Sequence, residues 1–186
     1  WNTNAAPPTS AWHDFNNDGL EDLLVPQLEP FNLGEPLLLQ NTGNDFVLLP
    51  GKLPSGIPYV SPSIGDFDND GLIDVYMTAL SLDDDQAPSR YSLFRNNGNF
   101  NFTQVNIPEI SEADGEGSFS SSWVDFNNDG NLDLFVANQD PGSQTLFQGD
   151  GTGEFTKITT GDLATDPLSN SYASWSDFDK NGFPDI

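Results

Sequence analysis

A nine-residue loop occurs four times in this sequence, and its oxygen-bearing side chains have the spacing of a cage for a hard cation. The copies, loops 1 to 4, begin at Asp14, Asp66, Asp125 and Asp177. Carboxylates or amides stand at loop positions 1, 3, 5 and 9, and glycine stands at position 6. Alternate side chains of a curled loop point inward, so these oxygens can converge on one ion. Glycine permits the positive φ that such a curl requires.

The chemistry of the loops favours Ca²⁺, with up to four ions and about one per repeat. Mg²⁺ demands near-octahedral geometry and retains its waters, and zinc is disfavoured because the chain has no Cys and only 1 His. We expect side-chain ligands from positions 1, 3, 5 and 9 and a backbone carbonyl from position 7, while position 4 points away from the ion. The expected ligands are Asp14, Asn16, Asp18, Leu20 and Asp22; Asp66, Asp68, Asp70, Leu72 and Asp74; Asp125, Asn127, Asp129, Asn131 and Asp133; and Asp177, Asp179, Asn181, Phe183 and Asp185.

These loops differ from an EF-hand, which needs a bidentate Glu at position 12 and a helix on each side. In loops 1 to 3, position 12 is Val or Met. The residues that follow the loops form short apolar runs, which are typical of buried strands: Leu23–Val25, Val75–Met77 and Leu134–Val136. Each loop is therefore expected to join strand to strand. The alternative is a metal-free turn, since Asp, Asn and Gly favour turns, but four copies argue against it.

The composition excludes several classes of partner. Lys+Arg number 5 against 29 Asp+Glu, a formal net charge of −24, so no basic face is available to bind nucleic acid. The chain has no Cys, which removes disulfides and thiol catalysis. It contains no apolar run of about 18 residues, so we expect no membrane insertion. Weak calcium loops are saturated only where Ca²⁺ is millimolar, which favours a secreted or cell-surface location.

The repeat extends beyond the loops and predicts an all-β fold. The loops recur after 52, 59 and 52 residues, a period typical of arrays of supersecondary units. An apolar strand follows each of the first three loops, and then comes a hairpin signature rich in Asn and Gly: Leu37–Phe46, Leu93–Phe100 and Leu146–Phe155. The 14 Pro and 17 Gly argue against long helices. Four short strands in about 50 residues describe a β-propeller blade, whereas a calcium-bound β-solenoid repeats every nine or so residues.

We expect a single partial propeller over residues 1–186, with three complete blades and the start of a fourth. The predicted repeats are about 9–50, 59–107, 117–160 and 169–186, the last incomplete. Propellers close with 4–8 blades. The remaining blades are therefore expected beyond Ile186, before Trp1 or from another chain.

The sequence resembles the FG-GAP/VCBS repeat of integrin-α-like propellers. The resemblance rests on the Asp-x-Asp/Asn-x-Asp/Asn-Gly-x-x-Asp loops, the Leu-Phe-x-Asn-x-Gly hairpins and the Trp-x-Asp-Phe segments that precede the loops. It implies a β-propeller with a Ca²⁺ loop between the first two strands of each blade, and it specifies no ligand. Asn at position 3 of loops 1 and 3, and Lys180 with Asn181 in loop 4, depart from the acidic pattern. We expect loop 4 to be the weakest site.

No catalytic constellation is visible, since the chain lacks a Cys nucleophile, a phosphate loop and a Ser-His-Asp pattern. A glycosidase-type carboxylate pair stays open. His13 precedes loop 1, and Gly65, Val124 and Ser176 take its place in the other repeats, so this position is expected to tolerate any residue. The Trp and Phe residues that repeat in register are expected to form the core.

The expected function is therefore non-enzymatic: a calcium-stabilised extracellular or cell-surface module that binds or adheres to a protein or a glycan. Propeller loops on a rigid ring suit such binding. The alternatives are the propeller part of a secreted carbohydrate-active enzyme and a structural subunit of a surface assembly. The acidic segments Asp83–Asp85 and Glu109–Glu116 are expected to be solvated loops.

Overall fold

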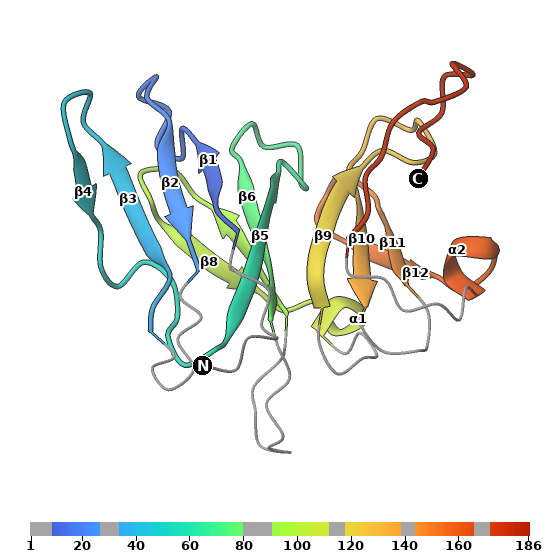
Figure 1. The fold of residues 1–186 in the computed structure, drawn as a ribbon, viewed down its shortest axis with the longest axis horizontal. Helices are drawn as coiled ribbons and strands as arrows, with labels where there is room; N and C mark the ends of the chain where they lie inside the picture. Colours follow the sequence, from blue (N-terminus) through green and yellow to red (C-terminus); the bar gives the residue numbers. More distant parts are fainter. Residues whose placement is uncertain (1–8, 27–33, 80–90, 112–117, 139–143, 166–171) are drawn as a thin grey trace.

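Three four-stranded antiparallel sheets make up most of the chain (Figure 1). This computed structural model describes residues 9–26, 34–79, 91–111, 118–138, 144–165 and 172–186. Blade 1 consists of β1 (Ala11–His13), β2 (Asp22–Val25), β3 (Leu37–Asn41) and β4 (Phe46–Leu48). Blade 2 consists of β5 (Tyr59–Gly65), β6 (Asp74–Ala79), β7 (Ser92–Asn96) and β8 (Phe102–Val105). Blade 3 consists of β9 (Ser118–Val124), β10 (Asp133–Asn138), β11 (Thr145–Gly149) and β12 (Phe155–Ile158).

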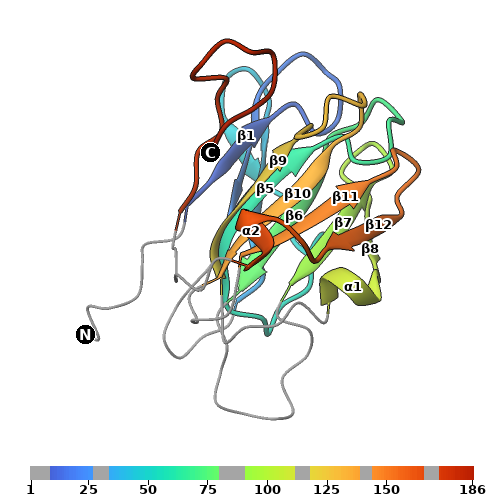
Figure 2. The ribbon, with the colours of Figure 1, turned by 90° about the vertical axis from the view of Figure 1, so that its right-hand side faces the viewer.

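Each blade is an up-and-down meander in which spatial order follows chain order. The predicted all-β fold of propeller blades is confirmed, and loops 1 to 3 lie between the first and second strands of their blades. The blades stand side by side, with β5 packed against β9, and the four loops gather at the upper end in Figure 1 (Figures 1 and 2). This arrangement places every candidate ligand at one end of the sheets.

The hydrophobic core lies between the blades. β6 and β10, the second strands of blades 2 and 3, are buried on both faces, whereas only alternate residues of β2 are buried. Along β6, Val75 and Met77 belong to a cluster shared with blade 1, whereas Tyr76 belongs to a cluster shared with blade 3. Along β10, Leu134 faces blade 2 and Phe135 packs toward the fourth unit. All five side chains are at most 2% exposed. Burial on both faces explains why these strands are continuous apolar runs without polar alternation.

Trp123 of β9 fills the junction between blades 2 and 3. Its ring stacks on Phe67 with centroids 6.3 Å apart and planes 13° apart. Gly65 of β5 permits this approach, since a Cβ there would lie 2.9 Å from Cγ of Trp123 and 2.8 Å from Cδ1 of Leu132. The expectation that the position before the loop tolerates any residue is therefore wrong at Gly65. The contact with blade 3 leaves no room for a side chain.

The aromatic residues that repeat in register are not all buried. Phe15 and Phe67 are each 1% exposed, as expected for core residues. Trp12, at the position equivalent to Trp123, is 52% exposed, and Phe178, at the position equivalent to Phe67, is 68% exposed. Where two described blades adjoin, the neighbouring blade covers the aromatic residue. No described blade covers Trp12 or Phe178.

The fourth unit, residues 172–186, contains loop 4. Ser176 and Asp185 form an isolated antiparallel bridge through backbone hydrogen bonds of 3.0 and 2.9 Å. Trp175 contacts Phe135 of blade 3 edge-on, with ring centroids 5.6 Å apart. The core therefore continues from blade 3 into this unit.

Two four-residue helices were not expected from the sequence: α1 (Pro108–Ser111) and α2 (Asp162–Thr165). α1 holds part of the segment Glu109–Glu116, whose remainder lies outside the described residues, as does Asp83–Asp85. His13 ends β1 and lies edge-on to Phe15 at 5.7 Å. Among the described residues, no helix is long and apolar enough to cross a membrane.

Candidate metal centre

Two left-handed residues give all four loops the same curled backbone. One is the predicted glycine at position 6, whose φ values are 89°, 87°, 89° and 94° in loops 1 to 4. The other is at position 4, where φ is 60°, 57°, 59° and 62° for Asn17, Asn69, Asn128 and Lys180. The left-handed conformation at position 4 was not predicted from the sequence. Three asparagines there were a signal for it, since Asn tolerates this region better than most residues.

Carboxylates at positions 1 and 5 fasten the curl by accepting backbone hydrogen bonds. In loop 2, Asp66 Oδ1 accepts from the N–H of Asp70 at 3.0 Å, and Oδ2 accepts from the N–H of Gly71 at 2.9 Å. Asp70 Oδ1 in turn accepts from the N–H of Leu72 at 2.8 Å. The other three loops repeat these contacts, with the amide oxygen of Asn181 taking the place of the position-5 carboxylate in loop 4. The predicted ligand residues therefore also build the loop that presents them.

The position-9 aspartates of the three blades are fully buried, at 0% exposure: Asp22, Asp74 and Asp133. Asp74 Oδ2 accepts from the N–H of Phe67 at 3.1 Å, and Oδ1 accepts from the N–H of Asn96 in β7 at 2.8 Å. Asp22 and Asp133 make the equivalent pairs of contacts. The last residue of each loop thus ties the loop to the third strand of its blade, a role that sequence spacing does not reveal.

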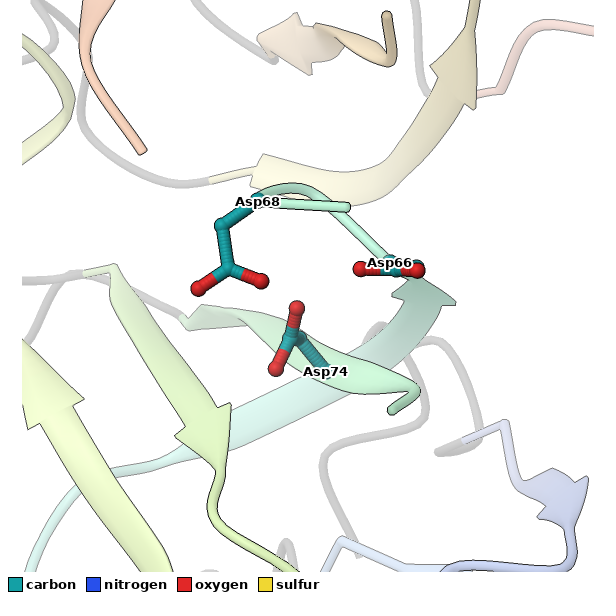
Figure 3. Close-up of side chains that lie close together, drawn as sticks. All are labelled: Asp66, Asp68 and Asp74. Atoms are coloured by element: carbon teal, nitrogen blue, oxygen red, sulfur yellow. The ribbon is translucent and has the colours of Figure 1, made fainter. Parts of the chain in front are cut away.

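Three acids converge in loop 2 (Figure 3). Single carboxylate oxygens of Asp66, Asp68 and Asp74 all lie within 4.8 Å of one another. The Asp68 side chain is only 8% exposed, and its Oδ2 lies 2.7 Å from Nε of Arg95. Its Oδ1 is buried and has no hydrogen-bond partner. A buried, unpartnered carboxylate oxygen beside two further carboxylates is a donor set suited to a hard cation.

The other loops differ at position 3. In loop 4, oxygens of Asp177, Asp179 and Asp185 also lie within 4.8 Å of one another. In loops 1 and 3 the Asn side chain at position 3 donates to the position-5 carboxylate at 2.8 Å, from Asn16 to Asp18 and from Asn127 to Asp129. The structure therefore brings the predicted ligands at positions 1, 3 and 9 together in loops 2 and 4. The remaining side-chain ligands, including all those of loops 1 and 3, stay predictions. The carbonyl ligands predicted at Leu20, Leu72, Asn131 and Phe183 stay predictions.

The loop pattern and the blades together identify the family. The model of the FG-GAP-like repeat matches residues 14–77, 79–136 and 125–186, which include all four loops. This chain belongs to the FG-GAP-like repeat family. The resemblance noted in the sequence is thereby confirmed. No curated protein matched the chain.

A solved structure supports the fold of this FG-GAP repeat chain. It is a lectin from Agrocybe aegerita, described as recognising non-reducing terminal N-acetylglucosamine. The two chains share 15% sequence identity with a TM-score of 0.54, and the match covers 87% of this chain and 41% of the lectin chain. The FG-GAP repeat chain thus spans about two fifths of the matched lectin.

FG-GAP loops 2, 3 and 4 contact one another through the residue at position 4. Nδ2 of Asn69 in loop 2 donates to Oδ1 of Asn131 in loop 3 at 3.1 Å, and Nδ2 of Asn128 in loop 3 donates to the carbonyl of Gly182 in loop 4. A Cβ at Gly151 would collide with the first of these amide pairs. The sequence predicted only that the position-4 side chain points away from the ion. In loops 2 and 3 this side chain also forms a hydrogen bond to the next loop.

Replacing Asn69 tests this arrangement. Asn69→Gly removes the 3.1 Å bond to Asn131 but suits a φ of 57°, whereas Asn69→Ala removes the bond and places alanine in a left-handed conformation. We expect alanine to lower the free energy of unfolding by about 1 kcal/mol more than glycine. Urea denaturation of both variants measures the difference. A glycine variant as unstable as the alanine variant would show that left-handed backbone at position 69 is unimportant.

Burial raises the pKa of the position-9 carboxyls. Desolvation raises the pKa of Asp74 to about 7 and that of Asp133 to about 6, against the lowering effect of their two backbone hydrogen bonds. Burial also raises the pKa of Asp22. Neighbouring loop carboxylates add to the rise at all three positions. A nearby cation would favour the charged form of these groups and oppose these shifts.

In EDTA we expect the melting temperature to fall as pH rises from about 5 to about 8. Asp74 and Asp133 keep a proton in the folded state up to their pKa values of about 7 and about 6, whereas the ordinary value is 3.8. Between these values the folded state binds more protons than the unfolded state, so stability is lost as pH rises. Asp129 and Asp150 have lowered pKa values and titrate below this window. Melting curves across this range, with and without Ca²⁺, measure how the melting temperature changes with pH. A melting temperature in EDTA that stays flat or rises with pH would contradict the raised pKa values of Asp74 and Asp133.

Proposed function

We propose that this FG-GAP repeat chain is a calcium-stabilised binding module that acts outside the cell or on its surface and recognises a glycan. The calcium site is supported chiefly by Asp68, which clusters with Asp66 and Asp74. Its Oδ1 is buried and has no hydrogen-bond partner. A carboxylate oxygen removed from water is costly unless a cation or a donor compensates it. Ca²⁺ accepts several such oxygens at once.

Two further features support the proposal that the module is extracellular and non-enzymatic. Loop sites of this kind bind Ca²⁺ with dissociation constants of about 10⁻⁴–10⁻³ M in extracellular modules, so they need a calcium-rich compartment. The loop carboxylates accept backbone hydrogen bonds within their own blades, and we assign them to structure rather than to acid-base chemistry. With a net charge of −24, the module should bind neither DNA nor heparin at physiological salt.

Calcium binding is tested by titration calorimetry on protein freed of metal with EDTA. We expect saturable Ca²⁺ binding and much weaker binding of Mg²⁺. Asp66→Asn should weaken the binding, because it alters a predicted ligand of loop 2. Asp162→Asn, which removes the same charge from α2 outside the loops, should leave binding unchanged. Absence of any Ca²⁺ heat, or equal loss in both variants, would contradict the proposal.

The lectin with a similar fold supports a glycan as the ligand to test first. Oligosaccharides ending in non-reducing N-acetylglucosamine, and controls ending in galactose, should be offered with Ca²⁺ and with EDTA. We expect binding in Ca²⁺ that declines in EDTA, since the loops lie at one end of the blades and shape that surface. Binding to neither sugar would favour a protein ligand, and release of free sugar from the probes would favour the enzyme alternative.

A further inference from the structure

Blade 2 differs from blades 1 and 3 at one position of its third strand. The fourth residue of that strand is Gln40 in β3, Arg95 in β7 and Gln148 in β11. The equivalence is structural, since each stands directly before the residue whose N–H binds the position-9 aspartate. Blade 2 therefore carries a cation where the other two blades carry a neutral amide.

The same blade also carries an additional carboxylate in its loop. Position 3 is Asn16 in loop 1, Asp68 in loop 2 and Asn127 in loop 3. Loops 1 and 3 thus combine three aspartates with a neutral strand residue, and loop 2 combines four aspartates with Arg95. Counted over loop positions 1, 3, 5 and 9 and the strand residue, the formal charge is −3 in all three blades, and Glu21 at position 8 adds one further negative charge in loop 1.

The two exceptional residues contact each other. Nε of Arg95 lies 2.7 Å from Oδ2 of Asp68, as an ion pair rather than a well-aligned hydrogen bond. The guanidinium carbon lies 5.5 Å from the ring centroid of Phe67. A Cβ at Gly153 of blade 3 would lie 3.0 Å from a terminal guanidinium nitrogen, so the hairpin of blade 3 confines the group. The partly exposed Arg95 side chain therefore lies between loop 2 and the hairpin of blade 3.

The pairing leaves the two oxygens of Asp68 with different surroundings. Oδ2 faces Arg95, whereas Oδ1 is buried without a partner, and the Asp68 side chain is directed toward Asp74 (Figure 3). A cation bound among Asp66, Asp68 and Asp74 would share Asp68 with the guanidinium. Two positive charges would then act on one carboxylate.

We propose that Arg95 is a built-in counter-charge that sets the calcium dependence of loop 2. It neutralises the additional carboxylate when no ion is bound, and it opposes the ion electrostatically when one binds. This inference rests on the proposed calcium binding. Loop 2 is consequently less dependent on Ca²⁺ for its stability than four aspartates alone would make it.

Three variants test the proposal: Arg95→Gln, Asp68→Asn and the double variant, which recreates the Asn and Gln pairing of blades 1 and 3. Arg95→Gln should lower the melting temperature in EDTA, because four carboxylates lose their counter-charge. It should enlarge the increase that Ca²⁺ produces and raise the affinity of loop 2 on the order of tenfold. Asp68→Asn should instead reduce the Ca²⁺ increment, since a ligand is lost while Arg95 remains.

The double variant is the decisive control. It should restore both the melting temperature in EDTA and the Ca²⁺ increment to near the native values. A purely structural Arg95 would lower the melting temperature equally in EDTA and in Ca²⁺, and that result would overturn the proposal, as would a double variant no better than Arg95→Gln. If the native chain fails to respond to Ca²⁺, the proposed function fails, and the comparison of variants in EDTA still reports on the pairing of Arg95 with Asp68.

Discussion

Replacing Asp74 with alanine is expected to lower the free energy of unfolding by about 2–6 kcal/mol. The side chain is fully buried, and its carboxylate accepts hydrogen bonds from the N–H groups of Phe67 and Asn96. Alanine leaves both donors buried without an acceptor, and each such donor costs about 1–3 kcal/mol. Urea denaturation in the presence of Ca²⁺ measures the loss.

Two comparison variants show whether the buried contacts are responsible. Asp74→Asn keeps one acceptor oxygen and should be intermediate between the native chain and the alanine variant. Asp70→Ala removes an exposed carboxylate of the same loop that accepts a 2.8 Å hydrogen bond from the N–H of Leu72, so it should cost less than Asp74→Ala. An Asp70 variant less stable than the Asp74 variant would show that the charge of the loop, rather than its attachment to β7, dominates stability.

Removing calcium is expected to lower the melting temperature on the order of 10 °C. With dissociation constants of about 10⁻⁴–10⁻³ M, millimolar Ca²⁺ contributes about 0.4–1.4 kcal/mol per site, or about 2–6 kcal/mol over four loops. In a chain of 186 residues, 1 kcal/mol corresponds to about 2–4 °C. Melting in EDTA, and again after Ca²⁺ is restored, measures this contribution.

Mg²⁺ is the matched control for the calcium experiment. It carries the same charge, but it demands near-octahedral geometry and releases its waters reluctantly, so it should restore little of the lost stability. Equal recovery with Mg²⁺ would mean that the loops sense only charge. A melting temperature unchanged by EDTA would rule out a stabilising metal in any loop.

The sequence alone predicted much of the fold and the candidate ligands. Asp, Asn and Gly at fixed spacing predicted the curled loops, and the apolar runs Val75–Met77 and Leu134–Val136 predicted buried strands. The Asn- and Gly-rich signatures predicted the hairpins between the third and fourth strands. These features are determined by neighbours within a few residues, so a local pattern is enough to identify them.

Where blades meet, the sequence predicted less. Gly65 was expected to be a permissive position, although Trp123 and Leu132 of the next blade leave no space for a side chain there. Trp12 was expected to lie in the core, yet it is 52% exposed, whereas its equivalent Trp123 packs against blade 2. In both cases the outcome depends on which blade covers the residue, and the local pattern is the same in every repeat.

The amino-acid sequence by itself determined the repeat, the all-β class and the set of candidate oxygen ligands, because each follows from residue types at short, fixed spacing. Only the tertiary structure decided what the individual carboxylates do. Asp74 became a buried acceptor for β7, and Asp68 became the partner of Arg95, because strands distant in sequence bring their N–H groups and a guanidinium to the loop. Spacing within a loop carries no information about such contacts, since they arise when the strands of a blade, and the blades themselves, pack together.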